Sequence, residues 1–347
     1  MFKQIGGLGE QEIAARRALI GSKLSYGVEY LDDATRGIFP DDLILLGAPS
    51  GAGKTQLCCN IALANLAAGR KVHYIALEAS EWEIEHRLKY PLVAERFFAD
   101  PYRPKVRLTY PDWVNGELLE ELSEYEKSAA KFFDDAFRDL FVFYKQNKFG
   151  IDEMLQTVAF CAAETSLVII DHVHYFDWDD DNENRAIKKI AMTARRLSLE
   201  EKKPIILVAH LRKKDRGAKD LVPGIEEFHG SSDLTKIATT VVTMSPGGVT
   251  STGNYETFFR ISKSRRDGGV TRYIGREFFS PRKGGYENGK YQIGWSGCTA
   301  ESGFEEIPSD DRPSWCAVRG ESNRDDVSRR QESFGRPEVP RYVPGGD

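Results

Sequence analysis

Short apolar runs alternate with longer amphipathic segments along the first three quarters of the chain. The runs have the length and composition of buried strands, and they fall at residues 43–46, 71–77, 140–144, 166–171, 204–209 and 239–244. The segments with helical character fall at residues 9–19, 56–68, 81–88, 116–136 and 183–199. Strands that alternate with helices predict an α/β fold, in which a mostly parallel, twisted sheet is flanked by helices.

The two ends of the chain differ from this pattern. Residues 257–262 and 271–279 flank a Gly-containing turn and predict an antiparallel hairpin. We expect residues 1–23 to hold a linker helix, residues 24–297 the main domain, and residues 298–347 a disordered polar tail that binds a partner. The linker helix either folds back on its own domain or docks on a neighbouring subunit.

The first apolar run leads into a glycine-rich turn and a helix, LILLGAPSGAGKTQL (residues 43–57). This order predicts a phosphate-binding loop, in which Lys54 reaches the β- and γ-phosphates and the Thr55 hydroxyl holds Mg²⁺. Ala48 stands where the strict pattern has glycine, and Gly47 comes one place early. The residues expected to contact ATP are Gly47, Ser50, Gly51, Ala52, Gly53, Lys54, Thr55 and Gln56.

Polar residues follow three of the later strands. Asp171 ends a buried run in the Walker B pattern and is expected to hold the Mg²⁺ shell. Glu78 follows the second run, where it either deprotonates the attacking water or caps the next helix. His210 is placed to sense the γ-phosphate. His172 and His174 form a His-x-His pair that lacks, in the sequence, the further ligands of a metal site.

Two basic segments are candidates for anionic partners, although the net charge of −5 does not indicate nucleic-acid binding. The loop after His210 suits a single-stranded DNA backbone, or else it is a solvated charged loop. Its cations are Arg212, Lys213, Lys214, Arg216 and Lys219. At the predicted hairpin, Lys263 and Arg265 are expected to reach a neighbouring subunit's nucleotide, with Arg265 as a trans-acting arginine finger.

Composition limits the class of protein. Hydrophobic residues make up 41% and charged residues 29% of the chain, as in ordinary globular proteins. No apolar run approaches the length that spans a bilayer, and the first residues have no secretory apolar region. Five cysteines without metal-type spacing indicate a reducing compartment, so we expect a cytoplasmic protein with no membrane partner.

The ordered set of motifs resembles the RecA-like motor domain of DnaB-type replicative hexameric helicases. The resemblance covers about residues 24–279 and is carried by the strings GVEYLDDATRGIFPDDLILLGAPSGAGKT, YIALEAS, LVIIDHVH, LVAHLRK, GSSDLTKIATTVVTM and ISKSRRDGG. It implies that Glu78 is the catalytic base, that the loop after His210 lines a DNA channel, and that Lys263 and Arg265 act across a ring, usually of six subunits. His210 stands where this family usually has Gln.

The resemblance implies an ATP-dependent, ring-forming helicase or translocase that needs ATP and Mg²⁺ and acts on single-stranded DNA. The family's N-terminal helical domain has no counterpart here, which suits a short phage- or plasmid-type form, and the tail is a candidate site for a loader or replisome protein. Two alternatives stay open. One is a RecA-like recombinase or loader that hydrolyses ATP on DNA without unwinding it, and the other is an ATP-switched assembly protein.

Overall fold

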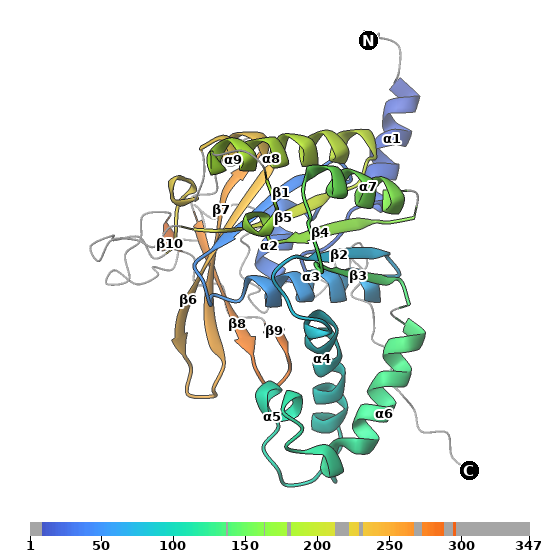
Figure 1. The fold of residues 1–347 in the computed structure, drawn as a ribbon. Helices are drawn as coiled ribbons and strands as arrows, with labels where there is room; N and C mark the ends of the chain where they lie inside the picture. Colours follow the sequence, from blue (N-terminus) through green and yellow to red (C-terminus); the bar gives the residue numbers. More distant parts are fainter. Residues whose placement is uncertain are drawn as a thin grey trace.

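The computed structural model describes residues 9–136, 138–162, 164–178, 182–211, 222–228, 232–266, 273–287 and 294–295. Its centre is a ten-stranded sheet with the order β10-β8-β7-β6-β1-β5-β4-β2-β3, and β9 pairs with β8 (Figure 1). The strands are β1 (Leu43–Ala48), β2 (Val72–Ala76), β3 (Leu140–Tyr144), β4 (Leu167–Asp171), β5 (Ile205–His210), β6 (Thr240–Val249), β7 (Tyr255–Ser264), β8 (Tyr273–Ser280), β9 (Gly285–Glu287) and β10 (Gly294–Trp295).

Helices cover both faces of this sheet (Figure 1). They are α1 (Gly9–Gly21), α2 (Glu29–Thr35), α3 (Lys54–Ala67), α4 (Glu83–Ala99), α5 (Tyr110–Val114), α6 (Leu119–Ala136), α7 (Ile151–Ala162), α8 (Glu183–Glu200) and α9 (Ser232–Ile237), with short 3₁₀ turns at Val173–Tyr175 and Ile225–Glu227. Among the described residues, no helix is both long enough and apolar enough to cross a membrane.

The strands β6, β1, β5, β4, β2 and β3 are mutually parallel, which confirms the predicted α/β class. Their alternating side chains feed two cores, because successive residues of a strand face opposite sides of the sheet. Ile44 and Leu46 of β1 pack with Leu57 of α3 in one core, and Leu43 and Leu45 pack under α8 in the other. Because both faces of the sheet are buried, these strands appear in the sequence as continuous apolar runs.

Parallel strands bring their carboxyl ends to one edge of the sheet. Ala48 of β1 pairs with His210 of β5, and Ala76 of β2 pairs with Asp171 of β4. The phosphate loop, Glu78, Asp171 and His210 therefore start from the same edge, where open α/β sheets bind their ligands. We call this the nucleotide edge.

Strands β7 and β8 each run antiparallel to the strand before them in the chain. Strand β7 pairs antiparallel with β6, and Lys263 lies opposite Val241 near the start of β6. The pairing of β7 with β8 confirms the predicted hairpin. Because β7 runs against β1, its last residues emerge at the edge opposite the nucleotide edge.

Helices α4, α5 and α6 form a helical arm that extends away from the sheet (Figure 1). The arm has its own small core, in which Tyr90, Phe97, Leu108 and Leu122 are buried. The sequence predicted a helix only over residues 81–88, but α4 continues through Pro91 to Ala99. A proline inside a helix removes one backbone hydrogen bond, and the apolar stripe that α4 buries beyond it offsets that cost.

Helix α1 confirms the helix expected over residues 9–19. It is exposed along the side chains that the structure describes, and Arg70 donates to the Gly21 carbonyl at its end (3.0 Å). The predicted tail of residues 298–347 lies outside the described residues. Docking of the helix on a neighbour and partner binding by the tail stay predictions.

Candidate nucleotide-binding and hydrolysis site

The turn between β1 and α3 has the backbone shape of a phosphate cradle. Gly51 and Gly53 have φ angles of 76° and 89°, in the left-handed region that favours glycine. Helix α3 begins directly after Gly53, at Lys54. Successive backbone N–H groups in such a turn form an anion-binding concavity, and the start of a 14-residue helix adds its positive dipole end. Ser50 and Ala52 belong to the same turn.

Gly47 has a packing role that the sequence did not reveal. It lies inside β1, and a Cβ atom at this position would stand 2.4 Å from the ring of Phe228 and 2.9 Å from Leu211. Those contacts are closer than carbon atoms allow, so a side chain here would displace the Phe228 ring. The early glycine therefore lets Phe228 cover the end of β1, while Ala48 supplies a buried carbonyl to the loop.

Lys54 is the first residue of α3 and is 7% exposed. Its ammonium donates to the carbonyls of Ala48 (3.3 Å) and Pro49 (3.2 Å) and lies 3.0 Å from His210 Nδ1. Burial lowers the pKa of Lys54, and the neighbouring charges of Asp171 and Glu78 oppose that shift. The cation is thus held at the nucleotide edge, within reach of the loop that would carry phosphates.

Asp171 and Thr55 meet beside this lysine. The Thr55 hydroxyl donates to Asp171 Oδ2 at 2.8 Å, and Tyr74 of β2 donates to the same oxygen at 2.8 Å. Burial raises the pKa of Asp171, while the hydrogen bonds from Tyr74 and Thr55 lower it. Asp171 Oδ1 is buried and has no hydrogen-bond partner among the described residues. A free carboxylate oxygen next to a threonine hydroxyl is the oxygen donor set that Mg²⁺ prefers, so these residues fit the predicted ion.

Tyr74 was missed in the sequence analysis. It is fully buried in the middle of β2, and a buried tyrosine hydroxyl needs a partner. That need was the available signal, but the identity of the partner depends on the pairing of β2 with β4. The tyrosine fixes one oxygen of Asp171 and leaves the other free.

Glu78 follows β2 and is 43% exposed at its side chain. The Tyr175 hydroxyl donates to Glu78 Oε1 (3.2 Å), and His172 Nε2 lies 4.0 Å from Oε2. The alternative role as a helix cap is not supported, because α4 begins five residues later, at Glu83, with Trp82 at its N-cap position. The carboxylate instead belongs to the polar cluster at the nucleotide edge.

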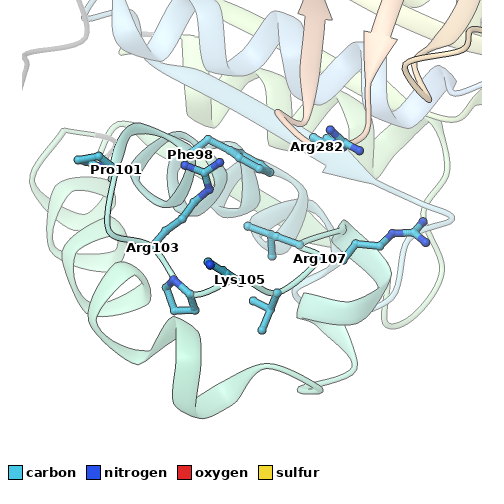
Figure 2. Close-up of a pocket in the computed structure, with 9 residues that line it drawn as sticks. Phe98, Pro101, Arg103, Lys105, Arg107 and Arg282 are labelled. Carbon is cyan, nitrogen blue, oxygen red and sulfur yellow. The ribbon is translucent and has the colours of Figure 1, made fainter.

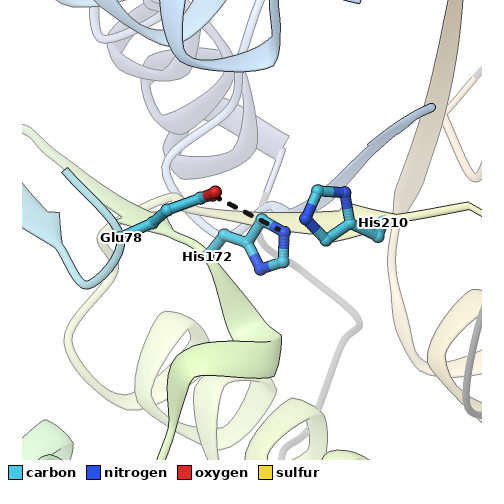
Figure 3. A group of neighbouring side chains, drawn as sticks. All are labelled: Glu78, His172 and His210. Atoms are coloured by element: carbon cyan, nitrogen blue, oxygen red, sulfur yellow. Dashed lines mark ion pairs between the residues drawn. The ribbon is translucent and has the colours of Figure 1, made fainter. Parts of the chain in front are cut away.

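Three side chains of this cluster lie close together (Figure 3). One donor atom from each of Glu78, His172 and His210 lies within 4.8 Å of the other two, and the rings of His172 and His210 are 3.8 Å apart. The sequence suggested that the His172–His174 pair has no further ligands, but the fold brings Glu78 and His210 to His172. Burial, with the charges of His210, His174 and Lys54, lowers the pKa of His172 to about 2, so its imidazole stays neutral.

Lys263 and Arg265 lie at the other edge of the sheet. Lys263 Nζ donates to the carbonyls of Thr235 (2.6 Å) and Lys236 (2.8 Å), and Arg265 Nη2 donates to the Lys236 carbonyl (3.0 Å). Both cations thus bond their own chain, and their action on a neighbouring subunit's nucleotide stays a prediction. They bond the last carbonyls of α9, as basic residues at helix ends do.

The remaining predicted residues divide into two groups. Gln56 of α3 is described, and it bonds the Gly284 carbonyl (3.4 Å) and accepts from Arg87 (3.4 Å). The residues predicted to bind DNA lie outside the described part of the chain: Arg212, Lys213, Lys214, Arg216 and Lys219.

Comparisons with known proteins identify the family and the fold. The family model of the DnaB-like helicase C terminal domain matches residues 23–274. Among solved structures, the ATPase domain of G40P aligns with a TM-score of 0.66 at 16% identity, over 82% of this chain and 99% of that one. A DnaB-like replicative helicase, described with its interactions with primase, aligns with a TM-score of 0.67 at 15% identity, over 82% of this chain and 68% of that one.

No curated protein matches the sequence. At these identities the solved structures establish a shared fold, which is the RecA-like helicase domain with its mostly parallel sheet and antiparallel C-terminal strands. The family match covers most of the chain and includes the phosphate loop, Glu78, Asp171, His210 and Arg265. The chain therefore belongs to the DnaB-like helicase C-terminal domain family.

Proposed function

We propose that the chain is an ATP-driven motor that assembles into a ring. Two neighbouring subunits share each ATP site, and the ring moves on single-stranded DNA during replication. The proposal rests on the positions of the residues expected to act in ATP hydrolysis, which lie at two opposite edges of the sheet. Lys54, Thr55, Glu78 and Asp171 lie at the nucleotide edge, and Arg265 lies at the opposite edge.

The strand register gives the distance between Arg265 and the phosphate loop of the same chain. Arg265 N bonds the Thr239 carbonyl (3.0 Å), and Thr239 N bonds the Leu43 carbonyl (2.8 Å), so Arg265 is level with the start of β1. Five residues from Leu43 to Ala48 and two strand spacings give a Cα separation of ~19 Å between Arg265 and Ala48. An arginine side chain extends ~7 Å from its Cα. Arg265 cannot reach the phosphate loop of its own chain, so a site that uses it must belong to a second copy.

The residues at the nucleotide edge have complementary roles. The glycine turn and Lys54 hold the β- and γ-phosphates, and Thr55 and Asp171 hold Mg²⁺. The ion held there would supply positive charge against the charge that develops on the phosphates. Glu78 accepts the proton of the attacking water, and Tyr175 orients its carboxylate through the 3.2 Å hydrogen bond. His210 is in hydrogen-bond range of Lys54, so it is placed to respond to the γ-phosphate.

DNA binding is assigned to the basic loop that follows His210. Its net charge of +3 over residues 211–224 suits a phosphate backbone. Because the loop begins one residue after His210, a change at the γ-phosphate would be passed directly to the DNA contacts. We assign the ring six subunits on family grounds, and we assign the tail to a loader or replisome protein.

The test is unwinding of a forked duplex with a 5′ single-stranded tail, with ATP and Mg²⁺. We expect ATP-dependent strand release, and its loss in Lys54→Ala, since that variant lacks the cation of the phosphate loop. Hydrolysis stimulated by single-stranded DNA without strand release would contradict helicase activity and favour a translocase, loader or recombinase. Hydrolysis that does not respond to DNA would favour the ATP-switched assembly protein.

A further inference from the structure

A cavity lies on the helical arm, between the α4–α5 loop and the turn that joins β8 to β9 (Figure 2). Its volume is about 580 Å³, within the range of small-ligand sites. Nine residues line it: Phe98, Pro101, Arg103, Pro104, Lys105, Val106, Arg107, Leu108 and Arg282. Two segments that are some 175 residues apart in the chain thus build one cavity.

The lining is strongly cationic. Arg103, Lys105, Arg107 and Arg282 are basic, and the nine lining residues include no acidic one. The nearest acid in the loop, Asp100, has its carboxylate engaged by the Tyr125 hydroxyl (2.6 Å) and the Tyr102 N–H (2.8 Å). Like charges that line one cavity repel one another, and an anionic ligand would neutralise them.

One of the cations, Arg103, is held by its own chain before any ligand arrives. Arg103 lies over the rings of Phe97 and Phe98, at 6.0 and 5.7 Å, and donates to the Asp100 carbonyl (3.2 Å). These contacts reduce the conformational entropy that the arginine would lose on binding.

The opposite wall is fixed against α4. The Tyr90 hydroxyl donates to the Pro281 carbonyl (3.0 Å), and a Cβ atom on Gly284 would stand 2.8 Å from the Pro91 ring. This close contact holds the β8–β9 turn, and with it Arg282, beside the α4–α5 loop.

The cavity is separate from the nucleotide site. Helix α4 begins five residues after Glu78 and runs for 17 residues, which corresponds to ~25 Å. The loop that lines the cavity follows the far end of that helix. On its other side, the β8–β9 turn that carries Arg282 reaches Gln56 of α3 through the Gly284 carbonyl (3.4 Å).

We propose that this cavity binds the phosphates of a single-stranded nucleic acid, as a contact additional to the loop after His210. Arginine guanidinium groups bind phosphate through paired N–H donors. Tyr102, between lining residues Pro101 and Arg103, is 93% exposed. A basic surface next to an exposed aromatic ring is the combination that tracks a single strand, since the ring stacks a base while the cations bind the backbone.

The experiment measures fluorescence anisotropy of a labelled single-stranded oligonucleotide with the full chain, without ATP, over a series of salt concentrations. The double variant Arg103→Ala/Lys105→Ala is compared with Lys127→Ala/Lys131→Ala, which removes the same charge from exposed positions of α6 on the same arm. Each phosphate contact to a single strand contributes about −0.7 to the slope of log K against log salt. We expect the slope of the first variant to be less negative by about 1.4 and that of the control to be unchanged.

The same pair of variants is then placed in a Lys213→Glu/Lys214→Glu background, in which the loop after His210 is reversed in charge. The slope difference should persist there, since the two contacts are independent. Equal slopes for the two variants would overturn the proposal.

Binding of inorganic pyrophosphate, measured by calorimetry in Lys54→Ala, separates the two sources of phosphate. Pyrophosphate binding that depends on Arg103, with no slope difference on the oligonucleotide, would show a site for a small phosphate and overturn the nucleic-acid assignment. No step here requires hydrolysis or unwinding, so failure of the helicase proposal and failure of this one are distinguishable.

Discussion

Mixing two inactive variants is expected to restore ATP hydrolysis if each site is shared by neighbouring subunits. Arg265→Ala lacks the cation of the far edge, and Glu78→Ala lacks the carboxylate of the nucleotide edge. The ~19 Å between Arg265 and Ala48 in one chain, estimated from the strand register, exceeds the reach of an arginine by ~12 Å. A site that uses both residues must therefore take them from two chains.

The size of the effect follows from the same geometry. Loss of an arginine finger lowers hydrolysis by ~10³-fold or more, so each variant alone should be almost inactive. In a ring assembled from a random 1:1 mixture, about a quarter of the interfaces pair an intact Glu78 with an intact Arg265. The mixture should then hydrolyse ATP at up to about a quarter of the wild-type rate, a rescue of ~10²-fold over either variant.

The assay is steady-state phosphate release, with subunit exchange verified by energy transfer between labelled chains. A mixture of Glu78→Ala with Lys54→Ala is the matched control, because both residues lie at the nucleotide edge of the same subunit and no interface regains both. Absence of rescue in the Arg265 mixture, with exchange demonstrated, would refute the shared site and favour one contained in a single subunit.

Three further predictions concern stability and pH. Gly47→Ala should lower the free energy of unfolding in urea by about 1–3 kcal/mol, because the new methyl group meets the Phe228 ring; an unchanged midpoint would show that the ring moves freely. Burial raises the pKa of Asp32 to about 7. The contribution of this carboxyl group to the free energy of unfolding is fully present below the unfolded-state pKa of about 4 and is lost as the pH rises through 7. In Asp32→Asn, the midpoint of urea unfolding should therefore depend less on pH over that window. Burial, with the charges of Arg265 and Arg195, lowers the pKa of Lys263 to about 8. The rate of ATP hydrolysis should therefore fall above pH 8 in the wild type and persist there in Lys263→Arg. Identical pH profiles for the two proteins would exclude a role for that charge.

Local sequence patterns determined much of the fold and of the candidate nucleotide site. A strand, a glycine turn and a helix are defined by neighbouring residues, so the phosphate loop with Lys54 and Thr55 was predictable from one stretch. The parallel sheet followed from apolar runs that alternate with helices, and a shared edge for Glu78, Asp171 and His210 followed from the common direction of their strands.

Only the tertiary structure decided which distant residues meet. The Tyr74 hydrogen bond to Asp171 depends on the pairing of β2 with β4, and the glycine requirement at position 47 depends on Phe228, 181 residues later. The extension of α4 through Pro91 was missed because local propensity opposes it, whereas burial of the arm's own core favours it. The four cations of the arm cavity come from two segments that no spacing rule connects, because long-range packing is not encoded in the order of neighbouring residues.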